Sequence, residues 1–170
     1  MQLMLLRHAK AEKAVPGMRD RDRKLNARGR GDAAKIADYM IRHDLRPDRI
    51  LVSAAARTRE TWQCMADAFA ATPIEYEDRL YESGPDAILA VIRELGRSAP
   101  VLLVIGHNPG LHDTARLLLA PASRGARELD DGLPTSGLVV IDFASKSWGK
   151  LAPGGGRLER FITPRLIRAG

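Results

Sequence analysis

Four short apolar runs, separated by longer stretches with helical spacing, dominate the chain. The runs are rich in aliphatic residues and do not alternate strictly between apolar and polar positions, as expected of strands covered on both faces. They lie at residues 3–6, 50–52, 101–105 and 138–141. Apolar residues recur at helical spacing within residues 33–40, 62–69, 88–95 and 111–119. This alternation predicts an α/β fold, a three-layer sandwich in which helices flank both faces of a largely parallel central sheet.

Length and composition fit a single domain that spans residues 1–170. A chain of 170 residues can bury a core without disulfides or metals. Cys64 is the only cysteine, so a disulfide framework and a cysteine-rich zinc site are both excluded. The N-terminal apolar run meets Arg7 and His8 too early for a signal peptide, and no later run reaches the length of a membrane span. We therefore expect a soluble, cytoplasmic protein.

The chain is basic, with a formal net charge of +6 and an isoelectric point near 9.9. Such a charge attracts acidic partners, such as nucleic acid, a phosphorylated protein or a small phosphate ester. The basic residues are interspersed with Asp and Glu, however, and aromatic residues that could stack on bases are few. We therefore expect a phosphorylated protein or a small phosphorylated substrate as the partner, and neither nucleic acid nor a membrane.

Arginines and histidines follow three of the predicted strands, at the point where each strand ends. Arg7 and His8 come directly after the first strand, Arg57 closes the segment after the second, and His107 follows the third. In an open α/β sheet the crevice beyond the carboxyl ends of the strands is the usual ligand site. We therefore expect these four side chains to meet in one site, provided that the three strands are neighbours.

The chemistry of this cluster favours a phosphoryl ligand. The guanidinium groups of Arg7 and Arg57 present planar donors that match phosphate oxygens, and each charge-assisted hydrogen bond contributes about 1.5–3 kcal/mol. A neutral imidazole is a competent nucleophile near pH 7, and its attack on phosphorus divides the hydrolysis into two easier transfers. His8, beside Arg7, is the expected nucleophile. His107 precedes Pro109, a good first helical position, and suits a donor to the phosphoryl oxygens.

The other two histidines are assigned to the surface or to structural roles. His43 lies near the end of a predicted helix among charged residues, and His112 lies one turn into the helix after Pro109. No two histidines stand at the i,i+4 spacing of a zinc-binding helix, and carboxylate clusters are weak. We therefore expect no metal ion and no other cofactor.

Three segments at the strand ends and one segment before the first predicted helix resemble four motifs of the histidine phosphatase superfamily, in its SixA-type phosphohistidine phosphatase branch. These segments are Leu6–Lys10, which resembles the opening motif, Asp22–Gly29, Ser53–Thr61 and Gly106–Pro109. The resemblance implies a phosphoglycerate mutase-like fold. It also implies that His8 is the phosphorylated nucleophile, that Arg7 and Arg57 clamp the phosphate, and that His107 is the second histidine of the pocket.

Two positions depart from the usual pattern of the family. Ala9 stands where glycine is usual and is expected to add a methyl group near the phosphate pocket, and Ala54 stands where proline is common. Neither change removes a reacting group.

Glu82 is the candidate general acid, by resemblance to the mutases and sugar phosphatases of the superfamily, although a solvated loop position is an equally good interpretation. An alkoxide leaving group needs a proton. Imidazole, whose protonated form has a pKa of about 6.5, leaves as a neutral molecule when the phosphorylated ring is already protonated. A phosphohistidine substrate would therefore dispense with Glu82.

The first hypothesis is thus a phosphatase that acts through a phosphohistidine on His8, on a protein phosphohistidine or on a small phosphate ester. A mutase that returns the phosphoryl group to its substrate is the second hypothesis. It would need to exclude water, and the short chain has no obvious insertion for a deep lid. A phosphate-binding module without turnover is the third, and it would have no need of a nucleophile beside an arginine clamp.

Overall fold

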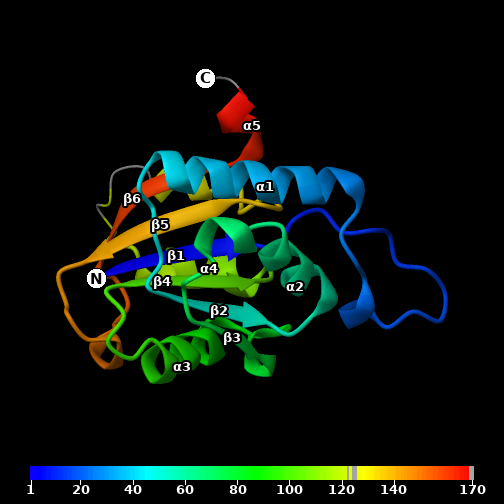
Figure 1. Cartoon of the computed structure of the whole chain (residues 1–170). Helices are drawn as coiled ribbons and strands as arrows, with labels where there is room; N and C mark the ends of the chain where they lie inside the picture. The colour runs from blue at the N-terminus through cyan, green and yellow to red at the C-terminus, as the bar shows by residue number, and fades with distance from the viewer. Residues whose placement is uncertain (122, 124–125, 169–170) are drawn as a thin grey trace.

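The computed structural model describes residues 1–121, 123 and 126–168, which form a six-stranded sheet with helices on both of its faces (Figure 1). The strands are β1 (Gln2–Arg7), β2 (Arg49–Ser53), β3 (Ile74–Glu77), β4 (Val101–Gly106), β5 (Leu138–Phe143) and β6 (Gly156–Ile162). The α-helices are α1 (Ala27–Arg42), α2 (Ala56–Gln63), α3 (Pro85–Leu95), α4 (Gly110–Leu118) and α5 (Pro164–Arg168). The strand order across the sheet is β3-β2-β4-β1-β5-β6.

The sheet is largely parallel, as predicted. Strands β3, β2, β4 and β1 pair in parallel, whereas β5 runs antiparallel to β1 and β6 antiparallel to β5. The ends of β1 and β4 lie side by side, because Arg7 pairs with Gly106. The carboxyl ends of the neighbouring strands β2, β4 and β1 therefore lie together at one end of the sheet.

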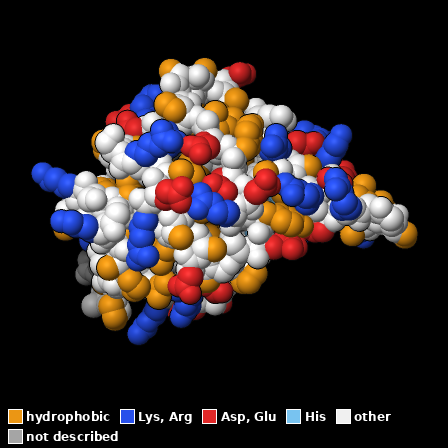
Figure 2. Space-filling view, turned by 90° about the horizontal axis from the view of Figure 1, so that it is seen from below, with side chains coloured by type: hydrophobic (Ala, Val, Ile, Leu, Met, Phe, Trp, Pro, Cys, Tyr) orange, Lys and Arg blue, Asp and Glu red, His pale blue; other side chains and the backbone are white. Residues whose placement is uncertain are grey.

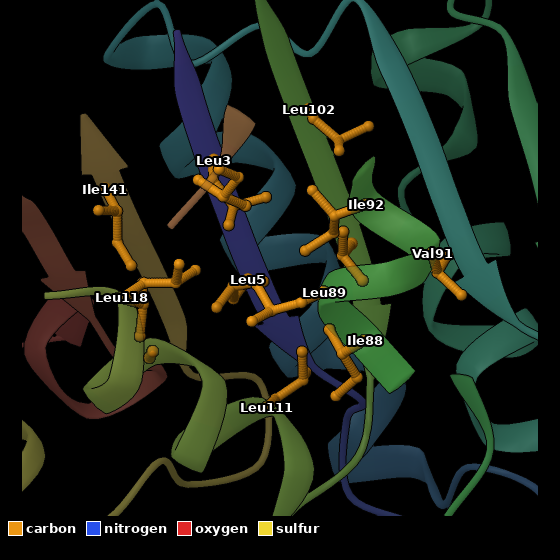
Figure 3. Packing of buried hydrophobic residues seen from close by; sticks show 14 of the residues in the cluster. Leu3, Leu5, Ile88, Leu89, Val91, Ile92, Leu102, Leu111, Leu118 and Ile141 are labelled. Atoms are coloured by element: carbon orange, nitrogen blue, oxygen red, sulfur yellow. The ribbon is translucent and has the colours of Figure 1, made fainter. Parts of the chain in front are cut away.

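Alternate residues of β1 enter two separate cores, which makes the fold a three-layer sandwich. Leu3 and Leu5 pack with α3 and α4 on one face, where Figure 3 shows them beside Ile88, Ile92 and Leu111. Met4 and Leu6 pack on the opposite face, with α1 and with the aromatic residues Trp62 and Phe69. Both faces of the central strands are thus buried, which explains why these strands read as continuous apolar runs.

The start of α1 is fixed against the segment that follows β1. The Asn26 side chain caps the helix by accepting a hydrogen bond from the Gly29 backbone amide at 2.8 Å. The Asn26 amide donates to the carbonyl oxygen of Lys10 at 3.0 Å. A Cβ atom on Gly29 would lie only 2.1 Å from that same carbonyl oxygen, so glycine permits the close approach. The first turn of α1 therefore packs against the backbone of Lys10, just beyond the end of β1.

Three sequence expectations differ from the structure. Strands β3 and β6 were not predicted. Both lie at the edges of the sheet, and within each strand charged residues interrupt the apolar ones. The helix expected through residues 62–69 is divided: α2 ends at Gln63, and a separate 3-10 helix covers Ala66–Phe69. Pro109 caps α4 and is not its first helical residue.

The surface mixes charges of both signs. On the face seen in Figure 2, Lys and Arg side chains lie among Asp and Glu side chains and form no continuous basic stripe. Within residues 1–121, 123 and 126–168, no helix has the length and apolar character that a membrane crossing needs.

Candidate active site

The four residues singled out from the strand ends surround one cleft. Arg7 ends β1, His8 follows it, His107 follows β4, and Arg57 lies in the first turn of α2, just beyond β2. The three strands are neighbours, as this convergence required. The cleft has a volume of about 250 Å³, enough for a tetrahedral oxyanion. It is lined by Arg7, His8, Lys10, Ala11, Arg23, Arg57, His107, Asn108 and Thr135.

His8 is held so that one ring nitrogen keeps its lone pair. Its Nδ1 lies 2.8 Å from the Ala9 carbonyl oxygen, which can only accept, so Nδ1 carries the proton and Nε2 keeps its lone pair. Arg57 Nε donates to His8 Nε2 at 3.3 Å. The lone pair therefore faces the guanidinium group, where a bound phosphoryl group would also lie.

Thr61 ties the loop that follows His8 to helix α2. The Ala9 amide donates to Thr61 Oγ1 at 3.0 Å, and the Thr61 hydroxyl donates to the Arg57 carbonyl oxygen at 2.6 Å. The expectation that the Ala9 methyl lies near the phosphate pocket is wrong. Ala9 is fully buried and packs with Leu25 and Ala33, because the β1–α1 connection turns this side chain inward.

His107 is oriented by the residue that ends β2. Its Nε2 lies 2.7 Å from Ser53 Oγ, and its Nδ1 is buried without a hydrogen-bond partner in the described part of the chain. When the Ser53 hydroxyl donates to Nε2, the proton of the neutral ring sits on Nδ1. In that tautomer His107 offers an unused N–H to a ligand. The His107 ring lies 5.2 Å from the His8 ring, measured between centroids.

Arg7 contributes a second unsatisfied donor. Its Nη1 donates to the Leu133 carbonyl oxygen at 2.9 Å, which fixes the side chain across the cleft. Its Nε is buried and has no partner among the described residues. Buried donors without partners are rare in native proteins. The unused N–H groups of Arg7 and His107 are what a bound anion would satisfy.

The environment keeps both cleft histidines neutral. Burial lowers the pKa of His8 to about 4; the charges of Arg57 and Arg7 act in the same direction, and the Ala9 hydrogen bond only partly offsets them. Burial, with the His8 and Arg57 charges, lowers the pKa of His107 to about 3. At neutral pH the positive charge of the cleft therefore comes from its arginines and Lys10, and His8 is a free base.

Two residues that the sequence did not single out contact residues that line the cleft. Asp20 lies in a 3-10 helix (Asp20–Asp22), and its carboxylate accepts hydrogen bonds from Arg57 Nη2 at 2.9 Å and from the Tyr81 hydroxyl at 2.8 Å. The Tyr81 ring meets His107 edge-on, with 5.4 Å between the ring centroids. Neither residue belongs to an apolar pattern, so only the folded chain shows that they reach the site.

The remaining sequence candidates lie outside the cleft. Glu82 is exposed on the loop after Tyr81 and is not among the residues that line the cleft. His43 is exposed at the end of α1. His112 lies on α4, and its Nε2 is 2.7 Å from the Leu129 carbonyl oxygen. Within residues 1–121, 123 and 126–168, no group of three or more His, Cys, Asp or Glu side chains is arranged to hold a metal ion.

Comparison with known proteins agrees with the geometry. Residues 3–87 match the model of the histidine phosphatase superfamily (branch 1). The uncharacterised protein Rv1276c of Mycobacterium tuberculosis is 32% identical over 164 residues, which cover 94% of this chain and 100% of the relative.

Two solved structures resemble the chain over almost its whole length. The Agrobacterium tumefaciens protein assigned as the phosphohistidine phosphatase SixA is 36% identical, with a TM-score of 0.80, over 96% of this chain and 97% of the other. The corresponding protein of Nakamurella multipartitia is 30% identical, with a TM-score of 0.84, over 96% of this chain and 95% of the other. The chain therefore belongs to the histidine phosphatase superfamily, in its SixA-type branch, and is a phosphatase.

Proposed function

We propose that this phosphatase removes phosphoryl groups from histidine side chains of a protein by transferring them to His8 and then to water. One observation carries the proposal: the Nε2 lone pair of a neutral His8 faces a cleft that also holds Arg57 and the unused N–H groups of Arg7 and His107. A nucleophile beside preorganised donors is the arrangement that phosphoryl transfer needs.

In the first transfer His8 Nε2 attacks phosphorus while the bond to the leaving group breaks. Arg7, Arg57 and His107 hold the equatorial oxygens, where negative charge is concentrated in the transition state. The Ala9 carbonyl oxygen, 2.8 Å from Nδ1, stabilises the positive charge that develops on the His8 ring. The backbone thus orients the nucleophile and supports its phosphorylated form.

The cleft favours a leaving group that needs no added proton. None of the described residues that line it is an Asp or a Glu. An alkoxide would leave slowly without a carboxylic acid donor, whereas a phosphorylated imidazole that is already protonated leaves as a neutral molecule. This difference favours a phosphohistidine substrate over a small alkyl ester, in agreement with the activity named for the SixA proteins.

In the second transfer water attacks the phosphoryl group on His8. The bond between phosphorus and Nε2 breaks, its electron pair returns to Nε2, and the proton lost by water remains on the released phosphate. The ring is again the neutral form protonated on Nδ1, with its Ala9 hydrogen bond intact. The same ring chemistry therefore serves both transfers.

Rapid-quench trapping in an alkaline denaturant tests the proposal, because a phosphohistidine is hydrolysed in acid and survives in base. The enzyme is mixed with a phosphohistidine peptide labelled on phosphorus, quenched within milliseconds, denatured and digested, and the labelled residue is located. We expect acid-labile label on His8 and release of inorganic phosphate without an acceptor. Label on another residue, or binding without labelling or turnover, would refute the proposal. Return of the label to the donor instead of to water would identify a mutase, and faster labelling by small esters would identify an ester phosphatase.

Acidification should remove activity. Because the pKa of His8 is lowered to about 4, the free base persists from neutral pH down to about that value. Below it, kcat/KM for the peptide should fall about tenfold per pH unit, since protonation consumes the lone pair. A rate that rises steadily below pH 5 would contradict a free imidazole nucleophile.

Circular dichroism at each pH provides the control for the acid profile. Both cleft histidines have lowered pKa values in the folded state, so the unfolded chain, with values near 6.5, binds more protons below that pH. Stability contributed by the neutral rings is therefore present above about pH 6.5 and declines as the pH falls toward 4. Rates are compared only where the protein remains folded.

Glu82→Gln should leave turnover of a phosphohistidine peptide nearly unchanged. Glu82 is exposed and does not line the cleft, and the imidazole leaving group needs no acid. The measurement is kcat/KM for the peptide and for an alkyl phosphate. A loss of about a hundredfold or more with the peptide, the usual scale of general-acid catalysis, would show that Glu82 is the acid after all.

A further inference from the structure

The carboxylate of Asp20 contacts Arg23 and Arg57, two residues that line the cleft, and has no part in the two transfers described above. Arg57 binds this residue twice, through Nη2 to the carboxylate at 2.9 Å and through Nη1 to the backbone carbonyl oxygen at 2.8 Å. Arg23 Nη1 donates to Asp20 Oδ1 at 2.9 Å, and the Tyr81 hydroxyl donates to Oδ2 at 2.8 Å. Three side chains therefore hold one exposed carboxylate in a fixed place.

This carboxylate is negatively charged at neutral pH. Burial alone would raise its pKa, but hydrogen bonds from Arg23, Tyr81 and Arg57 outweigh burial and lower the pKa to about 2. Asp20 is therefore unable to act as a general acid in the free enzyme. It is a hydrogen-bond acceptor bound to Arg57, beside a cleft whose lining offers mostly donors.

The guanidinium group of Arg57 separates Asp20 from the nucleophile. Its Nε faces His8 Nε2 at 3.3 Å, and its Nη2 faces the Asp20 carboxylate. In-line transfer places the leaving group on the side of phosphorus opposite to His8. His8 is buried, whereas the Asp20 side chain is 42% exposed, which favours a leaving group that departs on the solvent side of Arg57, where Asp20 lies.

Asp20 also has room for another donor. A carboxylate offers about four acceptor sites, and the contacts from Arg57, Arg23 and Tyr81 occupy three of them. Only Arg23 contacts Oδ1 in these hydrogen bonds. An N–H group of a bound substrate could therefore be accepted without displacing the others.

We propose that Asp20 is a specificity-determining residue that selects a protonated imidazole as the leaving group and disfavours leaving groups that depart with negative charge. The inference rests on the proposed function and names the residue that makes the cleft selective for a phosphoryl group bonded to nitrogen. Asp20 does for the leaving ring what the Ala9 carbonyl oxygen does for the attacking ring: each accepts the N–H of an imidazole whose other nitrogen is bonded to phosphorus.

The step balances without a further proton donor. The His8 Nε2 lone pair forms the new bond to phosphorus, and the electron pair of the broken bond goes to the substrate ring nitrogen. The proton on the other ring nitrogen stays in place, hydrogen-bonded to Asp20, so the substrate ring leaves neutral. A phenolate or alkoxide, by contrast, would depart with its negative charge beside the carboxylate.

Asp20→Asn tests the inference, with Asp22→Asn as the matched control. Asp22 lies in the same short 3-10 helix but pairs with Arg19 at 2.7 Å, and that helix has no buried residues. The substrates are phosphoimidazole, assayed at pH 6 where its ring is protonated, and p-nitrophenyl phosphate, whose leaving group is an anion. Inhibition by orthophosphate is measured for each variant, and thermal unfolding confirms the fold.

We expect Asp20→Asn to lower kcat/KM for phosphoimidazole about tenfold, the lower end of the value of a charge-assisted hydrogen bond, because Asp20 is half-exposed. Turnover of p-nitrophenyl phosphate should stay the same or rise, orthophosphate inhibition should not weaken, and Asp22→Asn should change none of these.

Equal losses on both substrates, or weaker phosphate inhibition, would show that Asp20 merely positions Arg57 and would overturn the inference. An unchanged rate with phosphoimidazole would also overturn it. If the wild-type enzyme fails to turn over phosphoimidazole with label on His8, the proposed function itself fails.

Discussion

Replacing His8 with Asn is expected to lower kcat/KM for a phosphohistidine peptide by at least about 10³-fold, the scale seen when a covalent nucleophile is removed. Asn keeps a polar side chain of similar size but has no lone pair able to attack phosphorus. The other groups in the cleft, Arg7, Arg57 and His107, remain in place. Phosphate release is the measurement, and rapid-quench trapping in an alkaline denaturant should find no labelled residue.

Binding separates this loss from a collapsed site. Orthophosphate binding by His8→Asn should stay within a few-fold of the wild type, because the charged donors that hold the oxygens are the two arginines. His43→Asn serves as the matched control, since His43 is exposed at the end of α1 and does not line the cleft. Turnover above about a tenth of the wild-type rate in His8→Asn would require a different nucleophile.

The sequence predicted those parts of the fold and the site that depend on burial and on strand ends. β1, β2, β4 and β5 are covered on both faces and therefore appear as apolar runs. The adjacency of β2, β4 and β1, which the sequence left as a condition, comes from the fold, and it brings His8, Arg57 and His107 together.

What the sequence did not predict depends on the surface and on long-range pairing. β3 has the sequence Ile-Glu-Tyr-Glu, and β6 contains Arg and Glu at exposed positions, so neither edge strand shows an apolar run. Asp20 reaches Arg57 across 37 residues from a short 3-10 helix with no periodic pattern. No local signal distinguishes Asp20 from the other charged residues of that segment.

Replacing Arg57 with Ala is expected to lower kcat/KM for the peptide by about 10²- to 10³-fold, the usual effect of removing one preorganised donor to a developing negative charge. The Arg57 side chain is only 7% exposed, so its charge acts in a poorly solvated site. Arg57→Lys should recover only part of the loss, because an ammonium group keeps the charge without the planar fork.

Arg59→Ala is the matched control on the same helix. Arg59 is exposed, donates to the Ala54 carbonyl oxygen and lies over the Tyr76 ring, away from the cleft. Its removal should change kcat/KM less than about twofold, as expected of surface substitutions. Retention of wild-type activity by Arg57→Ala would contradict a phosphate clamp at this position.

A double-mutant cycle between Arg57 and Asp20 then distinguishes positioning from direct recognition. If Asp20 acts only by orienting the guanidinium group, Asp20→Asn should have no effect on kcat/KM once Arg57 is Ala. If Asp20 accepts a hydrogen bond from the leaving imidazole, its substitution should still lower the preference for phosphoimidazole over p-nitrophenyl phosphate in the Arg57→Ala background. Arg23 and Tyr81 continue to hold the carboxylate there, through hydrogen bonds of 2.9 Å and 2.8 Å. We therefore expect the shift in substrate preference to persist while the overall rate stays low.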